Sequence, residues 1–228
     1  MRTVKAATAF GFVRDLQQLI DGVLPEHGVR FFERRSDNVL LVRTQRDDGD
    51  PSTIPLRVGG AVVADLDVRF ALSSEPASAR FRTETSQFRL LMRPDREPLA
   101  RFEYERTKSG APVAHWHVHA ERGAFTTMLA TASAAGRRQR DPSRLSTLHY
   151  PVGGSRFRPS IEEFLVFLIE ECGVDSLPGW RSAIADGQAR WVSTQAGLVA
   201  RENPEEAAAQ LRSMGWLVEG PGRERVSA

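Results

Sequence analysis

Hydrophobic and polar residues alternate with a period of two along much of the first half of the chain. The pattern is cleanest at residues 65–72, where Leu66, Val68, Phe70 and Leu72 alternate with Asp65, Asp67 and Arg69. Successive side chains of a β-strand point to opposite faces of the sheet. This pattern therefore predicts an antiparallel meander with one covered face, built from strands at residues 29–33, 38–46, 54–58, 61–72, 79–92, 99–107 and 113–122.

Two further details of the pattern refine the predicted sheet. Phe81 and Phe88 have opposite parity, which indicates that a bulge or a turn interrupts the strand near Thr85. The polar face is expected to carry Asp65, Asp67, Arg69, Arg82 and Glu84, and charged faces of this kind usually face solvent. A short edge strand is expected at residues 145–151.

Helical periodicity flanks the strands on both sides. Apolar residues recur at helical spacing over residues 6–24 and again from Gly123 to Gly136. Ser160 and Glu163 form a capping box for a helix that extends to Cys172 and is apolar nearly all round, so it should be buried under the sheet. Shorter helices are expected at residues 178–186, 189–202 and 204–214.

The predicted fold is therefore of the α+β class. It consists of an antiparallel β-meander packed on a buried helix, with an N-terminal helix and a helical C-terminal extension. The predicted domains are residues 1–173, which contain the sheet, and residues 174–228, a helical extension that packs on it.

One predicted strand carries three of the five histidines of the chain. On this strand His115, His117 and His119 share a face with Glu121, and Trp116 lies on the other face. The preceding strand can be paired with it through a hairpin at residues 108–110, which ends in glycine. This register sets Phe102 opposite Trp116, Tyr104 opposite Ala114, Glu103 opposite His115 and Arg101 opposite His117. A slip of one residue would mix the apolar and polar faces.

The histidine face has the residue types of a metal or acid–base site. Residues two apart on a strand are separated by about 6.6 Å, so one ion cannot easily bind three imidazoles of a straight strand. His115 and His117 with Glu103 from the neighbouring strand could bind a divalent metal ion or act in acid–base chemistry, with Arg101 beside them. The alternative is a solvated sheet face on which histidine is tolerated.

Composition adds an arginine bias. Only Lys5 and Lys108 are lysines among the 31 basic residues, although the formal net charge of the 228 residues is only +2. The planar guanidinium group suits paired hydrogen bonds to phosphate. Most arginines are interspersed with acidic residues, but one cluster forms a candidate phosphate-binding patch, for which a solvated loop is the alternative: Arg137, Arg138, Arg140, Arg144, Arg156 and Arg158.

Several classes of protein are disfavoured. The single cysteine, Cys172, excludes an internal disulfide and a cysteine-cluster zinc site. The glycines at 153 and 154 lack the spacing of a phosphate-binding P-loop. No apolar run approaches the roughly 20 residues of a membrane helix, and the first 25 residues carry charges unlike those of a secretory signal. We therefore expect a cytoplasmic protein that does not insert into a membrane.

Two resemblances to known families rest on these motifs. The segments Arg101-Phe102-Glu103-Tyr104, His115-x-His117-x-His119 and 156–165 resemble the TumE-type toxins of bacterial toxin–antitoxin pairs, over roughly a third of the chain. Gly110, His115, His117, Glu121 and Pro151-x-Gly153 are similar to the motifs of cupins. The helix expected from Ile161 departs from the barrel strands of a cupin.

Three functions follow as hypotheses. The first is a histidine- or metal-dependent phosphodiesterase or ribonuclease-like enzyme of a defence or toxin–antitoxin system. In it His115, His117, Glu103 and Arg101 would be catalytic, and Arg156, Arg158, Arg137 and Arg138 would bind phosphate. The second is a non-catalytic regulatory module that binds nucleic acid or protein, and the third is a cupin-like metalloprotein. The oligomeric state is left open.

Overall fold

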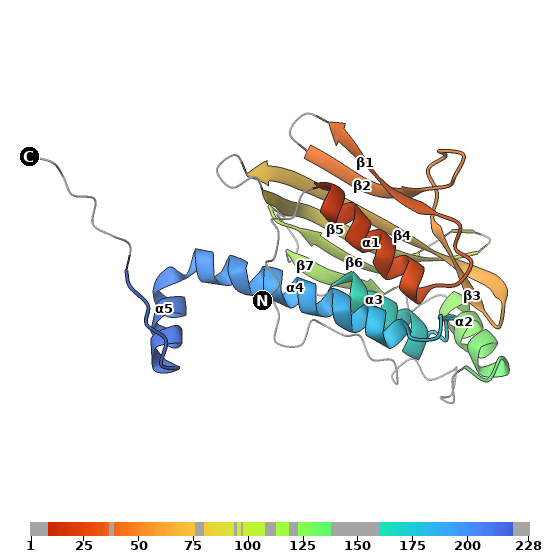
Figure 1. Cartoon of the computed structure of the whole chain (residues 1–228). Helices are drawn as coiled ribbons and strands as arrows, with labels where there is room; N and C mark the ends of the chain where they lie inside the picture. The colour runs from red at the N-terminus through yellow and green to blue at the C-terminus, as the bar shows by residue number, and fades with distance from the viewer. Residues whose placement is uncertain are drawn as a thin grey trace, which may run out of the picture. The chain divides into compact units, whose positions relative to one another are not determined.

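The computed structural model describes residues 9–36, 39–75, 80–93, 95–96, 98–107, 113–118, 123–137 and 160–220. The chain divides into two compact units, Met1–Gly187 and Gln188–Ala228. The first unit contains an antiparallel sheet and its helices, and the second is helical (Figure 1). This arrangement confirms the predicted α+β class. The predicted domain boundary at 173–174 stays a prediction.

The described strands are β1 (Arg30–Ser36), β2 (Val39–Gln45), β3 (Ile54–Val58), β4 (Ala61–Glu75), β5 (Arg80–Met92), β6 (Pro98–Glu105) and β7 (Ala114–Val118). The described helices are α1 (Ala9–Val23), α2 (Gly123–Ala134), α3 (Ile161–Val166), the π-helical turn η2 (Phe167–Glu171), α4 (Trp180–Glu202) and α5 (Pro204–Ser213). The edge strand predicted at 145–151 lies outside the described residues. None of the described helices is long and apolar enough to cross a membrane.

Every described strand pairing in the sheet is antiparallel. The strand order is β1-β2-β4-β5-β6-β7, and β3 pairs with β4. Between β4 and β5 the register shifts, because Ala71 pairs with Thr85 whereas Leu72 pairs with Thr83. The shift confirms the bulge that the parity of the phenylalanines predicted.

Helices α1 and α3 cover the apolar face of the sheet (Figure 1). Phe12 of α1 packs edge-on against Phe70 of β4, with ring centroids 5.1 Å apart. Phe164 of α3 stacks on Trp116 of β7 at 5.5 Å and lies 6.0 Å from Phe88 of β5. The buried helix is therefore under the sheet, as its sequence predicted.

The start of α3 is fixed by its capping residues. The Glu163 carboxylate accepts a hydrogen bond from the Ser160 backbone N–H at 3.0 Å, as the capping box predicted. The helix stays regular only to Val166, and the N–H of Cys172 then donates to the carbonyl of Phe167, five residues back, at 3.2 Å. The last turn of the predicted helix is therefore π-helical.

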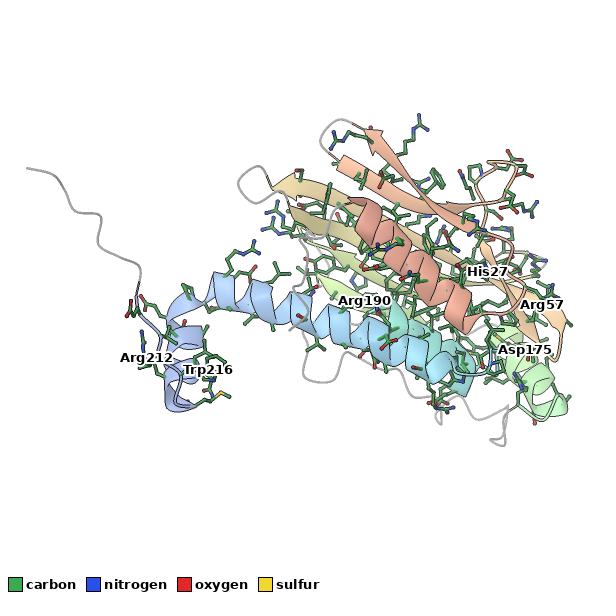
Figure 2. All side chains as sticks on the ribbon, in the orientation of Figure 1. His27, Arg57, Asp175, Arg190, Arg212 and Trp216 are labelled. Carbon is green, nitrogen blue, oxygen red and sulfur yellow. The ribbon has the colours of Figure 1, made fainter. Side chains whose placement is uncertain are left out.

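The segment after η2 is hydrogen-bonded to the hairpin between β3 and β4. The Asp175 carboxylate accepts hydrogen bonds from the backbone N–H groups of Gly59 at 3.2 Å and Gly60 at 2.7 Å. The Asp175 N–H also donates to the carbonyl of Arg57 at 2.7 Å (Figure 2). This end of the sheet is thereby joined to the buried helix.

One helix boundary was predicted wrongly. The sequence suggested two helices, at 178–186 and 189–202, but α4 continues through Gly187. A β-carbon at position 187 would lie 2.5 Å from Oε1 of Glu162, so glycine is needed there for close packing and does not end the helix. The start of α5 at Pro204 was predicted correctly.

Candidate metal centre

The pairing of β6 with β7 sets the positions of the candidate residues. Glu103 pairs with His115, Arg101 pairs with His117, and Phe102 pairs with Trp116. Phe102 and Trp116 belong to the apolar core, with ring centroids 5.5 Å apart. The predicted register is confirmed, and the histidines project from the face opposite the core.

The three candidate ligands form one compact group. Oε2 of Glu103 lies 3.5 Å from Nε2 of His115 and 3.9 Å from Nε2 of His117. One ligand atom from each residue can be chosen so that all three lie within 4.8 Å of one another. Ligands bound at 2.0–2.1 Å around a tetrahedral Zn²⁺ are separated by about 3.4 Å, so small side-chain movements would bring all three onto one ion.

The two carboxylate oxygens of Glu103 have different neighbours. Nε2 of Gln87, on β5, donates a 2.7 Å hydrogen bond to Oε1, and Nε of Arg101 lies 3.6 Å from the same oxygen. Oε2 faces the two imidazoles. Gln87 therefore orients the carboxylate, in the way that outer residues of metal sites orient the ligands themselves.

The site is sheltered but open to solvent on one side. The side chains of His115 and Glu103 are 13% and 16% exposed, and that of His117 is 41% exposed. Burial acts to raise the pKa of the Glu103 carboxyl. The hydrogen bond from Gln87 and the charges of Arg101, His117 and His115 outweigh this effect, so the pKa of Glu103 lies below its ordinary value. Glu103 is thus held as a carboxylate, the form that binds metal.

The lowered pKa of Glu103 predicts a pH dependence of stability. The unfolded chain binds the proton of Glu103 more readily than the native protein does, so this residue stabilises the fold above its ordinary pKa near 4.5. The stabilisation is lost as the pH falls through the lowered native pKa. We expect the free energy of unfolding, measured with urea at a series of pH values, to fall less steeply at acid pH in Glu103→Gln than in the parent protein. Glu105→Gln, on the same strand, serves as the control. An unchanged fall at acid pH in Glu103→Gln would contradict the lowered pKa.

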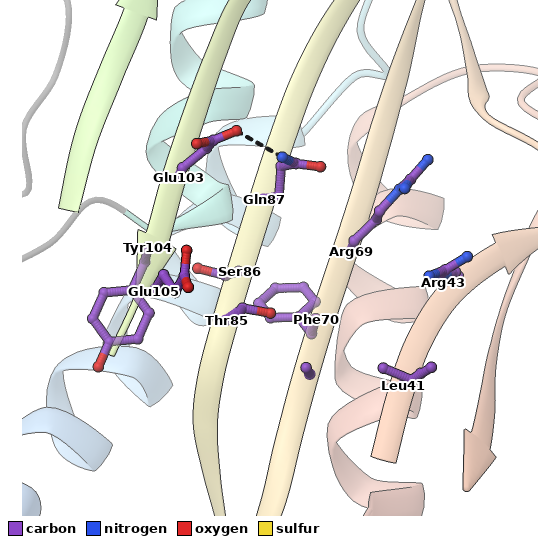
Figure 3. A pocket seen from close by; sticks show the side chains of 11 residues that line it. Leu41, Arg43, Arg69, Phe70, Thr85, Ser86, Gln87, Glu103, Tyr104 and Glu105 are labelled. Carbon is purple, nitrogen blue, oxygen red and sulfur yellow. Dashed lines mark hydrogen bonds between the residues drawn. The ribbon is translucent and has the colours of Figure 1, made fainter. Parts of the chain in front are cut away.

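The polar face of the sheet continues from this group across three more strands, β5, β4 and β2. Glu103 pairs with Gln87, and Gln87 pairs with Arg69 of β4. Arg43 of β2 comes next in the same register, because its neighbour Val42 pairs with Phe70. Figure 3 shows these four side chains on successive strands. They border a cavity of about 240 Å³.

Sequence reasoning missed Gln87, Arg43 and the burial of two aspartates on this face. The side chains of Asp65 and Asp67 are only 1% and 8% exposed, although the alternation suggested a solvent-facing surface. The signal for Gln87 was present, because extending the predicted pairing by one strand sets β5 beside Glu103. Burial of the aspartates could not be read from alternation, since it depends on which arginines fold over them.

The other predicted site residues fall elsewhere. Arg137 follows α2 and forms an ion pair with Asp175 at 3.0 Å. Several candidates lie outside the described residues, so their roles stay predictions: His119, Glu121, Arg138, Arg140, Arg144, Arg156 and Arg158.

No protein-family model, curated protein or solved structure matches the chain. The resemblances to TumE-type toxins and to cupins therefore stay predictions. The candidate site must be interpreted from its own geometry.

Proposed function

We propose that the protein is a metal-dependent phosphodiesterase, which holds one divalent first-row transition metal ion through His115, His117 and Glu103. The observation that carries this proposal is the compact group of ligand atoms, all within 4.8 Å, that two paired strands bring together. Three protein ligands with a remaining open position are typical of catalytic zinc sites, whereas structural sites are closed by four. The exposure of His117 supports access to that position.

The ion would supply a water molecule activated for attack on phosphorus. The chain itself supplies the positive charge beside it. Arg101 lies next to Glu103, and its buried Nε forms no hydrogen bond with any residue in the described part of the chain. A donor in this position suits the negative charge that develops on a phosphoryl group during hydrolysis.

The donor set also restricts the metals to be tested. Two imidazoles and one carboxylate bind Zn²⁺ in hydrolases, and they bind Fe²⁺ in oxygenases. Mg²⁺ and Ca²⁺ prefer oxygen ligands and fit this group poorly. A titration panel should therefore contain Zn²⁺, Mn²⁺, Co²⁺ and, without oxygen, Fe²⁺.

Metal binding to the full chain is the first test. We expect calorimetric titration of metal-free protein to give one site per chain. His117→Ala and Glu103→Gln should each weaken binding by more than about 100-fold, because loss of a ligand should exceed the 10–100-fold cost of losing an outer residue. Gln87→Ala should fall within that 10–100-fold range.

Glu105→Gln is the matched control for Glu103→Gln, because Glu105 lies two residues further on the same strand. It should bind metal as the unchanged protein does. His117→Ala, Gln87→Ala and Glu105→Gln should keep the thermal unfolding midpoint of the parent, since the exchanged side chains lie outside the apolar core. Glu103→Gln should lower the midpoint slightly at neutral pH, because it removes a carboxylate that stabilises the fold. Wild-type affinity in both His117→Ala and Glu103→Gln would refute the metal site.

Hydrolysis is the second test. Metal-loaded protein should cleave bis(p-nitrophenyl) phosphate, a chromogenic phosphodiester, and chelator or His117→Ala should abolish the cleavage. Arg101→Met should lower kcat, and its affinity for the metal should equal that of the Glu105→Gln control. Metal binding without cleavage of this ester, of single-stranded RNA or of a cyclic dinucleotide would leave the protein a metal-binding module and refute the enzymatic part of the proposal.

A further inference from the structure

A second and larger cavity opens on the same polar face of the sheet. It has a volume of about 430 Å³, within the usual range of small-molecule sites. One wall is the loop between β2 and β3, which is tied back to β2 by a 3.0 Å hydrogen bond from Ser52 N–H to the Thr44 carbonyl. His27, labelled in Figure 2, also lines the cavity. Five arginines line the cavity: Arg43, Arg46, Arg69, Arg93 and Arg96.

Two buried aspartates fix the guanidinium groups on this face. Asp65 accepts two hydrogen bonds from Arg93, at 2.7 and 2.9 Å, and lies 3.6 Å from Arg96. Asp67 accepts hydrogen bonds from Arg69, at 3.0 and 3.1 Å, and from Arg89. Each aspartate thus holds two arginines, which leaves an excess of one positive charge around each.

Two more arginines add to this excess. Within the described part of the chain, the side chains of Arg43 and Arg46 form no hydrogen bond or ion pair, although both line the cavity. The cavity therefore has five guanidinium groups against three carboxylates: Asp50 and Asp67 in its lining, and Asp65, which pairs with Arg93 and Arg96. A merely solvated surface does not require buried carboxylates that hold arginines in place. An anion-binding site benefits from them, because fixed donors lose less entropy on binding.

We propose that this cavity binds a phosphate group of a small phosphorylated ligand. Guanidinium groups match phosphate oxygens in pairs, and several of them around one cavity neutralise more than one negative charge. Arg43 and Arg46 would make the direct contacts, because they have no described ion-pair partner to give up. Arg69 and Arg93, held by the aspartates, would supply fixed positive charge beneath the ligand.

The position of the cavity connects it to the candidate metal centre. Arg43 and Arg69 also line the smaller cavity, which extends to Glu103 (Figure 3). Arg69 and Glu103 are two strands apart in register, a separation of about 10 Å between their backbones. A substrate with two phosphate groups could place one at the metal and the other on the arginines. This step alone rests on the proposed function.

The test of the anion site uses full-length His117→Ala protein, so that it does not depend on metal. Inorganic pyrophosphate should bind by calorimetric titration at low salt, and Arg43→Ala and Arg46→Ala should each weaken binding by about tenfold or more. Arg35→Ala, on β1 but outside the cavity lining, is the matched control and should change nothing. Addition of about 1 M NaCl should weaken binding strongly.

Two results would overturn the anion site: no binding of pyrophosphate at low salt, or equal affinity in Arg43→Ala, Arg46→Ala and the parent. Citrate separates phosphate recognition from general anion attraction, and citrate binding as tight as that of pyrophosphate would refute the phosphate assignment.

The link to the metal centre has a separate readout in the metal-loaded enzyme. There, Arg43→Ala should raise the KM for a 5′-phosphorylated dinucleotide without changing kcat, and should leave the KM for bis(p-nitrophenyl) phosphate unchanged. Equal effects on both substrates would refute the link and leave the anion site standing.

Discussion

Replacing Trp116 with alanine is expected to lower the free energy of unfolding by about 3 kcal/mol, the lower end of the range for large aromatic residues in cores. The indole stacks on Phe164 with an interplanar angle of 14° and contacts the rings of Phe102 and Phe167. It therefore joins β7 to the buried helix. The lower end applies because Trp116 is only partly buried.

Urea unfolding monitored by circular dichroism measures this loss. His117→Ala is the neighbouring control on the opposite face of β7 and should change stability by less than about 0.5 kcal/mol, as surface substitutions usually do. Because β7 supports His115 and His117, Trp116→Ala should also weaken metal binding. Wild-type stability in Trp116→Ala would mean that the contacts of the indole with α3 and β6 do not hold the strand in place.

The sheet could be predicted well because the alternation of apolar and polar residues assigns each side chain to a face and also fixes the register between neighbouring strands. Between β6 and β7, the requirement that Phe102 and Trp116 share the apolar face fixed the register, and the register then set Glu103 beside His115. The candidate metal centre followed from this single pairing. Local patterns were sufficient here because the two strands are joined by a short connection.

Features that depend on packing between distant segments could not be predicted. Gly187 resembled a helix end in the sequence, but its absent side chain makes room for Glu162, 25 positions earlier in the chain. The π-helical turn at Phe167–Glu171 has no local signature of the kind that the capping box gave. Such features are decided by tertiary contacts, which override local preference.

The arginine cavity illustrates the same limit on the functional face. Arg43 lies on β2, Arg69 lies on β4 and Arg93 directly follows β5, and each is unremarkable in its own segment. The sequence directed attention instead to the run beginning at Arg137, because consecutive arginines are conspicuous. Charges brought together by sheet pairing are visible only once the order of the strands is known.

The buried aspartates lead to the second large effect. Arg93→Met should destabilise the protein by about 2–3 kcal/mol, because it removes the main partner of Asp65, whose side chain is 1% exposed. Loss of one partner from a fully buried ion pair costs about 3–5 kcal/mol. The smaller value is expected because Arg93 itself is 43% exposed and Arg96 remains 3.6 Å from the carboxylate.

Asp65→Asn is the informative comparison. It removes the buried charge and leaves Arg93 and Arg96, both of which water can reach, so its cost should be smaller than that of Arg93→Met. Urea unfolding of both variants shows which of them loses more free energy of unfolding. If Asp65→Asn proved the more destabilising, the aspartate would be contributing to the fold itself. If Arg93→Met is the worse, Asp65 is a buried charge that depends on its arginines, which is the arrangement expected where a carboxylate is retained to hold guanidinium groups toward a ligand.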